Sequence, residues 1–110
     1  MDNTTFENVV QNQLNYCKVL LKGKGTEYNK IDREDDTDRL LFFKKAAALQ
    51  GISAKEALVG MMAKHTVSIY NMCKDDQAHS LDKWEEKITD HINYLLLLKA
   101  LVSEEAHEQI

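Results

Sequence analysis

The stretch "ALQGISAKEALVGMMAKHTVSIYNM", Ala48 to Met72, contains the end of one helix and nearly all of the next. Gly51 follows a run of apolar residues, and glycine is the residue that most often ends a helix. Just beyond it, Ser53 and Glu56 have the spacing of a capping box, which satisfies free N–H groups at a helix start. The apolar residues that follow recur with a period near 3.6. The stretch therefore predicts two consecutive helices.

The remainder of the chain has the same character. Its apolar residues follow helical periods, no segment alternates as a strand does, and the sequence contains no proline. Ser80 offers an N-cap for a last helix, and "KGKG" at residues 22–25 has the glycines and lysines that end a first one. The predicted fold is all-α, a single-domain antiparallel four-helix bundle. The predicted helices cover 5–22, 38–50, 53–73 and 81–103, with a long polar loop over 23–37.

Composition restricts the class of function. The chain has 110 residues and a net charge of −4, which disfavours nucleic-acid binding by bulk electrostatics. No apolar run reaches the length of a membrane span, and the polar start "MDNTTFENVV" differs from a signal peptide. Cys17 and Cys73 lack metal-site spacing and are expected to be buried or half-buried thiols in a reducing compartment. We therefore expect a cytoplasmic protein without a membrane partner.

Polar residues interrupt two of the apolar stripes. Lys64 and His65 lie within the stripe of the third predicted helix, and Asp90 lies within that of the fourth. A half-buried carboxylate requires a nearby cation, which could be a lysine, an arginine or a metal ion. Two interpretations stay open: these residues line a polar pocket between the third and fourth helices, or they form a buried structural network.

Other residues are candidates for phosphate or nucleotide binding. Arg39 and Lys44 lie near the start of the second predicted helix, where free N–H groups favour an anion. Tyr28, in the polar loop, could stack on a base or pack over the end of the bundle. For each of these residues a solvated charged or polar surface is the alternative. The sequence contains no P-loop and no GxGxxG, HExxH or GxSxG motif.

Several of these segments resemble a known group of proteins. "KGTEY", "DRLLFFKKAA", "ALVGMMAKHTVSIYNM" and "EKITDHINYLLLLKAL" together resemble small proteins of bacterial phages and prophages, over Lys22–Val102. "DHINYLLLL" is also similar to the last core helix of the all-α nucleoside triphosphate pyrophosphohydrolases, the MazG and dimeric dUTPase group. That resemblance implies an oligomeric four-helix core with Mg²⁺ on carboxylates, which cleaves a nucleoside triphosphate to a monophosphate and pyrophosphate. Glu86 and Asp90 match one carboxylate pair of that superfamily loosely, and its ExxE pair is absent.

Two functions are therefore expected from the sequence. One is nucleotide binding or pyrophosphohydrolase-like activity in a homo-oligomer, with His65 and Asp90 as catalytic residues. In this interpretation Glu86 and Asp90 would hold Mg²⁺, and the nucleotide would be bound by Tyr28, Arg39, Lys44 and Lys64. The other is a non-catalytic phage accessory protein in the bacterial host cytoplasm that binds and inhibits a host protein. The missing ExxE pair favours binding without catalysis.

Overall fold

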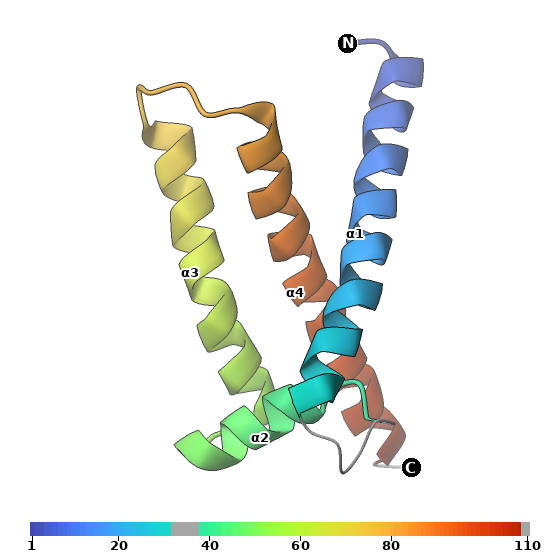
Figure 1. Ribbon diagram of the computed structural model, residues 1–110, viewed down its shortest axis with the longest axis vertical. Helices are drawn as coiled ribbons and strands as arrows, with labels where there is room; N and C mark the ends of the chain where they lie inside the picture. The colour runs from blue at the N-terminus through green and yellow to red at the C-terminus, as the bar shows by residue number, and fades with distance from the viewer. Residues whose placement is uncertain (32–37, 109–110) are drawn as a thin grey trace.

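The computed structural model describes residues 1–31 and 38–108, with side chains described for 1–23 and 38–107. The described residues form four helices and no strand (Figure 1). The helices are α1 (Asn3–Ile31), α2 (Leu41–Gln50), α3 (Ala54–Lys74) and α4 (Leu81–Glu108). The all-α prediction is confirmed. None of the described helices combines the length and apolar content required to cross a membrane.

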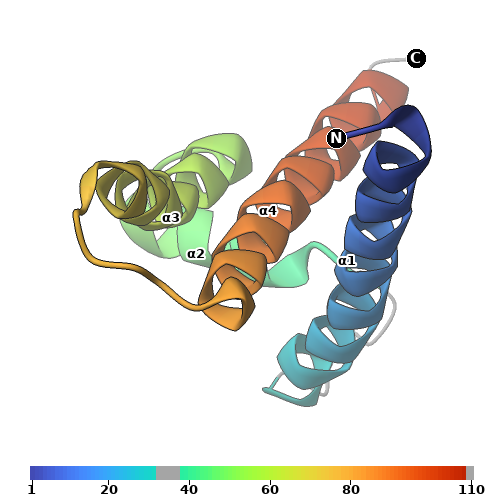
Figure 2. The same ribbon diagram turned by 90° about the horizontal axis from the view of Figure 1, so that it is seen from above.

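The helices pack as three pairs: α3 with α4, α2 with α3, and α1 with α4. α3 and α4 run antiparallel side by side, and the short α2 lies across the lower end of α3 (Figure 1). α1 packs against α4 on the other side and crosses it obliquely, so that the first turns of α1 extend away from the bundle (Figure 2). The side chains of residues 1–12 are accordingly all exposed. The bundle is therefore open, with α4 in the centre.

The predicted signals at helix ends are confirmed around α3. Gly51 ends α2 in the left-handed conformation with φ 68°, while the N–H of Ile52 donates to the carbonyl oxygen of Ala47 at 3.1 Å. These are the features of a Schellman motif. The Oγ of Ser53 accepts from the N–H of Glu56 at 3.1 Å, as in a capping box. The Oγ of Ser80 likewise accepts from the N–H of Lys83 at 3.1 Å, which caps α4.

The predicted boundaries of α1 and α2 need correction. α1 continues to Ile31 instead of ending near residue 22, so the segment 23–31 is helical and not a loop. Gly23 keeps a negative φ, and with no proline present nothing removes a helical hydrogen bond. α2 begins at Leu41 and not at Asp38, because the Asp38 Oδ1 accepts from the N–H of Leu40 at 2.9 Å before the helix starts.

The apolar core lies at the lower end of the bundle, where α2, α3 and α4 meet. Its fully buried cluster consists of Leu40, Phe43, Leu58 and Leu101. Higher up, Cys17 is buried between α1 and α4, whereas Cys73, expected to be at least half-buried, is exposed, and both are free thiols. The core is therefore concentrated at one end, and the upper half of the molecule is held by narrower contacts.

Replacing Gly51 with alanine should lower the free energy of unfolding by about 1 kcal/mol, because a Cβ is strained at φ 68°. Urea unfolding followed by circular dichroism measures the change. Gly23→Ala is the matched control, because Gly23 is helical and a Cβ there meets no atom within 4 Å. This control should unfold at an unchanged or slightly higher urea concentration. An equal loss in both variants would contradict the role of Gly51.

Candidate functional site

An open groove of about 500 Å³ lies where α2, α3 and α4 meet. α2 contributes its last residue, Gln50, while α4 contributes Tyr94. The α3 side includes Gly60 and Lys64, which are four residues apart and so lie one above the other on the same face. The full lining is Gln50, Ala57, Gly60, Met61, Lys64, His65 and Tyr94. The volume falls within the range of small-molecule sites in proteins.

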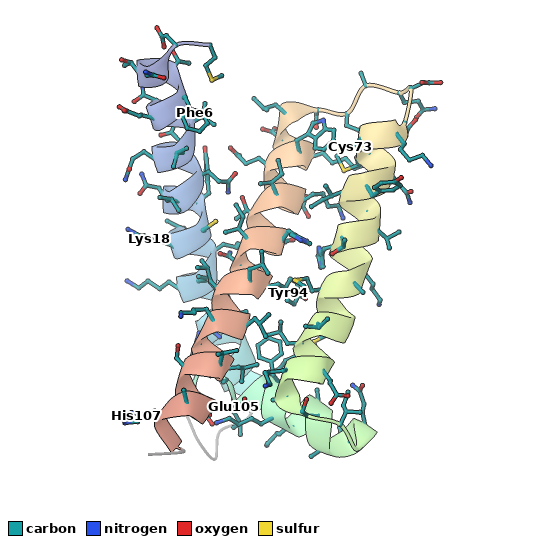
Figure 3. All side chains as sticks on the ribbon, turned by 180° about the vertical axis from the view of Figure 1, so that it is seen from behind. Phe6, Lys18, Cys73, Tyr94, Glu105 and His107 are labelled. Atoms are coloured by element: carbon teal, nitrogen blue, oxygen red, sulfur yellow. The ribbon has the colours of Figure 1, made fainter. Side chains whose placement is uncertain are left out.

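Two aromatic rings form one wall of this groove. The imidazole of His65 and the phenol ring of Tyr94 have centroids 5.0 Å apart and planes inclined by 44°. Figure 3 shows Tyr94 in the space between α4 and α3. His65 is half-buried, whereas Lys64 is exposed and its ammonium group is accessible to a ligand. Lys64 and His65 thus line a pocket between α3 and α4, as the first interpretation of the sequence predicts.

No packing contact or backbone conformation among the described residues requires a glycine at position 60. Glycine inside a helix costs about 1 kcal/mol relative to alanine. A Cβ built at Gly60 would meet nothing within 4 Å, and the backbone there has no positive φ. Neither close packing nor backbone strain therefore requires this glycine. The space above it opens into the groove beside Lys64.

A second, much smaller hollow of about 20 Å³ lies behind the groove, between α1, the start of α2, and α4. Arg39, Asp90 and Asn93 line it, and Tyr94 lines both this hollow and the groove. The Nη2 of Arg39 donates to the carbonyl oxygen of Leu21 at 2.9 Å and so ties α1 to the start of α2. The hollow is large enough for about one water molecule.

Some polar groups that line this hollow have no hydrogen-bond partner among the described residues. The Nη1 of Arg39 and both amide atoms of Asn93 are buried without a hydrogen-bond partner among the described residues. Asn93 is only 5% exposed, so solvent does not reach it. An unsatisfied buried polar group costs about 1–3 kcal/mol, and a single bound water could meet several of these groups at once.

The structure separates the other predicted site residues from the groove. The Nζ of Lys44 lies 2.8 Å from Asp38 and 2.6 Å from Glu104, which joins α2 to the end of α4. Hydrogen bonds to these two carboxylates raise the pKa of Lys44, and its charge is matched within the chain. Glu86 lines a third hollow, between α1 and α4. The side chain of Tyr28 lies outside the described residues.

The predicted Mg²⁺ site does not fit the residues that the structure describes. Glu86 and Asp90 line different hollows, and Asp90 shares its hollow with the cation Arg39. Across residues 1–31 and 38–108, no three His, Cys, Asp or Glu side chains come together as a metal would require. Mg²⁺ needs a near-octahedral set of hard oxygen ligands. The described residues therefore do not form a Mg²⁺ site.

Comparison with protein-family models, with curated proteins and with solved structures finds no match to this chain. These comparisons thus show no link to phage proteins or to the pyrophosphohydrolase superfamily.

Sequence reasoning assigned no role to Tyr94, Asn93 or Gln50, although Asn93 was visible as a polar residue inside "DHINYLLLL". The signal for Tyr94 is its position four residues after Asp90, which places both on one face of α4. Gln50 had no usable signal, because it lies at the end of α2 and enters the groove only through the packing of α2 against α3.

Replacing Asn93 with leucine, which has the same branched shape and number of side-chain heavy atoms, should raise the free energy of unfolding by about 1 kcal/mol, because it removes two unsatisfied buried atoms. Urea unfolding measures the difference. Thr89→Val is the contrasting control, since the Thr89 hydroxyl accepts from the Gln13 Nε2 at 2.7 Å and its loss should destabilise the protein. A less stable Asn93→Leu protein would instead indicate that a bound water or ligand satisfies the amide.

Proposed function

We propose that this protein binds a nucleotide in the groove between α2, α3 and α4. The observation that carries the proposal is the combination of Lys64, an exposed cation, with the open position at Gly60 and the ring pair of His65 and Tyr94 in one groove. A phosphate and an aromatic base are two of the three parts of a nucleotide, with the sugar between them, and the groove offers one partner for each of these two.

The groups in the groove have complementary tasks. The ammonium group of Lys64 provides three hydrogen-bond donors on a flexible stem, which suits a phosphate oxygen. The ring of Tyr94 offers a flat apolar face on which a base can stack, in the way that aromatic side chains bind bases elsewhere. The side-chain amide of Gln50 can donate to and accept from a base edge. Gly60 lets the ligand approach the backbone of α3.

The groove favours binding over hydrolysis. Its lining among the described residues contains no carboxylate, whereas cleavage of a phosphoanhydride needs positioned charge, commonly from metal ions held on carboxylates. Asp90, predicted to be catalytic, lies in the hollow behind Tyr94. His65 would then position the ligand through its ring and not act on water. This supports nucleotide binding without catalysis.

Lys64→Gln should weaken nucleotide binding about tenfold, because a charge-assisted hydrogen bond to phosphate contributes about 1.5–3 kcal/mol. Isothermal titration calorimetry with a panel of nucleoside mono- and triphosphates measures the affinity. Lys18→Gln is the matched control, since Lys18 is an exposed lysine on α1, far from the groove (Figure 3). Failure of every nucleotide to bind at millimolar concentration, or equal affinity in the two variants, would refute the proposal.

Gly60→Ala should increase the free energy of unfolding by up to about 1 kcal/mol while weakening nucleotide binding. The two effects have opposite signs only if the open space serves a ligand. Thermal unfolding with and without nucleotide measures both, because a ligand that binds the native state raises its apparent stability. Pyrophosphate release by the wild-type protein in the same samples would overturn the non-catalytic part of the proposal.

A further inference from the structure

α4 carries a heptad series of apolar residues that the described part of the chain leaves exposed. Leu81, Ile88, Leu95 and Val102 follow one another at intervals of seven residues. They are exposed by 81%, 37%, 48% and 44% respectively. Between them lie Glu85, Ile92 and Lys99, so that the spacing along the series alternates between four and three residues. We call these seven residues the α4 seam. A seam of this period is typical of a helix that packs against another helix.

A second heptad series on α4 is already occupied. Tyr94 and Leu98 pack against the core cluster, and the ring of Tyr94 lies beside that of His65 in α3. Trp84 and His91, at seven-residue intervals before Leu98, are half-buried. At about 100° per residue, Tyr94 lies roughly 120° around α4 from the α4 seam. α1 packs at a different place, through Thr89. Within the α4 seam, Glu85 also lines the hollow between α1 and α4, and Ile92 is half-buried. The other five residues of the seam are exposed, and they form an additional face beside the one that packs against α1.

The accessible surface of the whole molecule supports this reading. It amounts to 8178 Å². A compact monomer of 12.6 kDa is expected to expose about 6,200 Å². The radius of gyration is 16.3 Å, against about 13 Å for a compact domain of this length. The excess of about 2,000 Å² is more than the roughly 800 Å² that each partner buries in a standard interface. This excess includes the exposed residues 1–12 of α1 as well as the α4 seam, so the chain has enough open surface for an interface of standard size.

The charges in the α4 seam indicate which molecule covers it. Glu85 and Lys99 lie seven residues before and seven residues after Ile92, so the two charges are opposite in sign and symmetric about the middle of the seam. If two copies of α4 pack antiparallel, Glu85 of each copy comes within about one turn of Lys99 of the other. A parallel pair would place glutamate beside glutamate and lysine beside lysine.

We propose that the protein forms a two-fold symmetric dimer in which the α4 seams of two copies pack antiparallel. The interface buries the leucine, isoleucine and valine side chains of the seam, and two Glu85–Lys99 pairs set its direction. A self-complementary patch of this kind is what a two-fold interface requires. Because the nucleotide groove opens on another side of α4, each copy keeps its own groove exposed. The dimer does not depend on the proposed nucleotide binding, and either proposal can fail without the other.

Sedimentation equilibrium of the full chain, over micromolar to millimolar concentration, tests the proposal. The wild-type protein should have twice the monomer mass of 12.6 kDa. Leu95→Glu, at an exposed position, should give the monomer mass with an unchanged helical circular dichroism signal. Val67→Glu is the matched control, because Val67 is 59% exposed on α3 and outside the seam. A wild-type monomer throughout, or a Leu95→Glu dimer, would overturn the proposal.

The orientation has its own test. Glu85→Lys and Lys99→Glu should each weaken dimerisation roughly tenfold, because each places like charges opposite one another twice in the antiparallel dimer. The double variant Glu85→Lys/Lys99→Glu should restore the wild-type dissociation constant. Asp82 and Glu86 line the same hollow as position 85, so their negative charges can compensate a lysine at that position within its own chain. Equal dissociation constants for wild type, both single variants and the double variant would rule out the antiparallel arrangement.

Discussion

The fold depends on the packing of Leu58 at the junction of α2, α3 and α4. This side chain is fully buried and belongs to one cluster with Leu40, Phe43 and Leu101, which come from the other two helices of the junction. α2 can reach this cluster only because Gly51 reverses the chain between α2 and α3. The tight turn thus places α2 across the base of the bundle, and the groove opens directly above it.

The polar residues inside the apolar stripes serve two different arrangements. Lys64 and His65 border an open groove, whereas Arg39, Asp90 and Asn93 surround a hollow of molecular-water size. Tyr94 separates the two. The pocket interpretation therefore holds for Lys64 and His65. Arg39, Asp90 and Asn93 instead line a separate hollow, where Arg39 ties α1 to the start of α2.

Local signals predicted more of this structure than patterns of charge did. The helix starts at Ser53 and Ser80 and the stop at Gly51 were readable, because each depends on one or two neighbouring residues. The length of α1 was not, since glycines at 23 and 25 allow a helix as well as a turn. The sequence also grouped Arg39 and Lys44 with Lys64 as phosphate-binding residues, but the structure keeps them apart. Which side chains meet depends on how the helices pack, and charge patterns do not show that. Lys44 forms ion pairs with Asp38 and Glu104, and Glu104 lies sixty residues away in the sequence.

The attachment of α1 to α4 has a kinetic consequence. α2, α3 and α4 follow one another along the chain, and most of their contacts join successive helices, which favours rapid folding. α1 joins them through contacts of long sequence separation, such as Gln13 with Thr89, 76 residues apart. Loop closure over that distance makes the docking of α1 the later event. It also makes α1 the element that opens first from the native state, so its amide hydrogens should exchange with solvent through a sub-global opening while α3 stays protected.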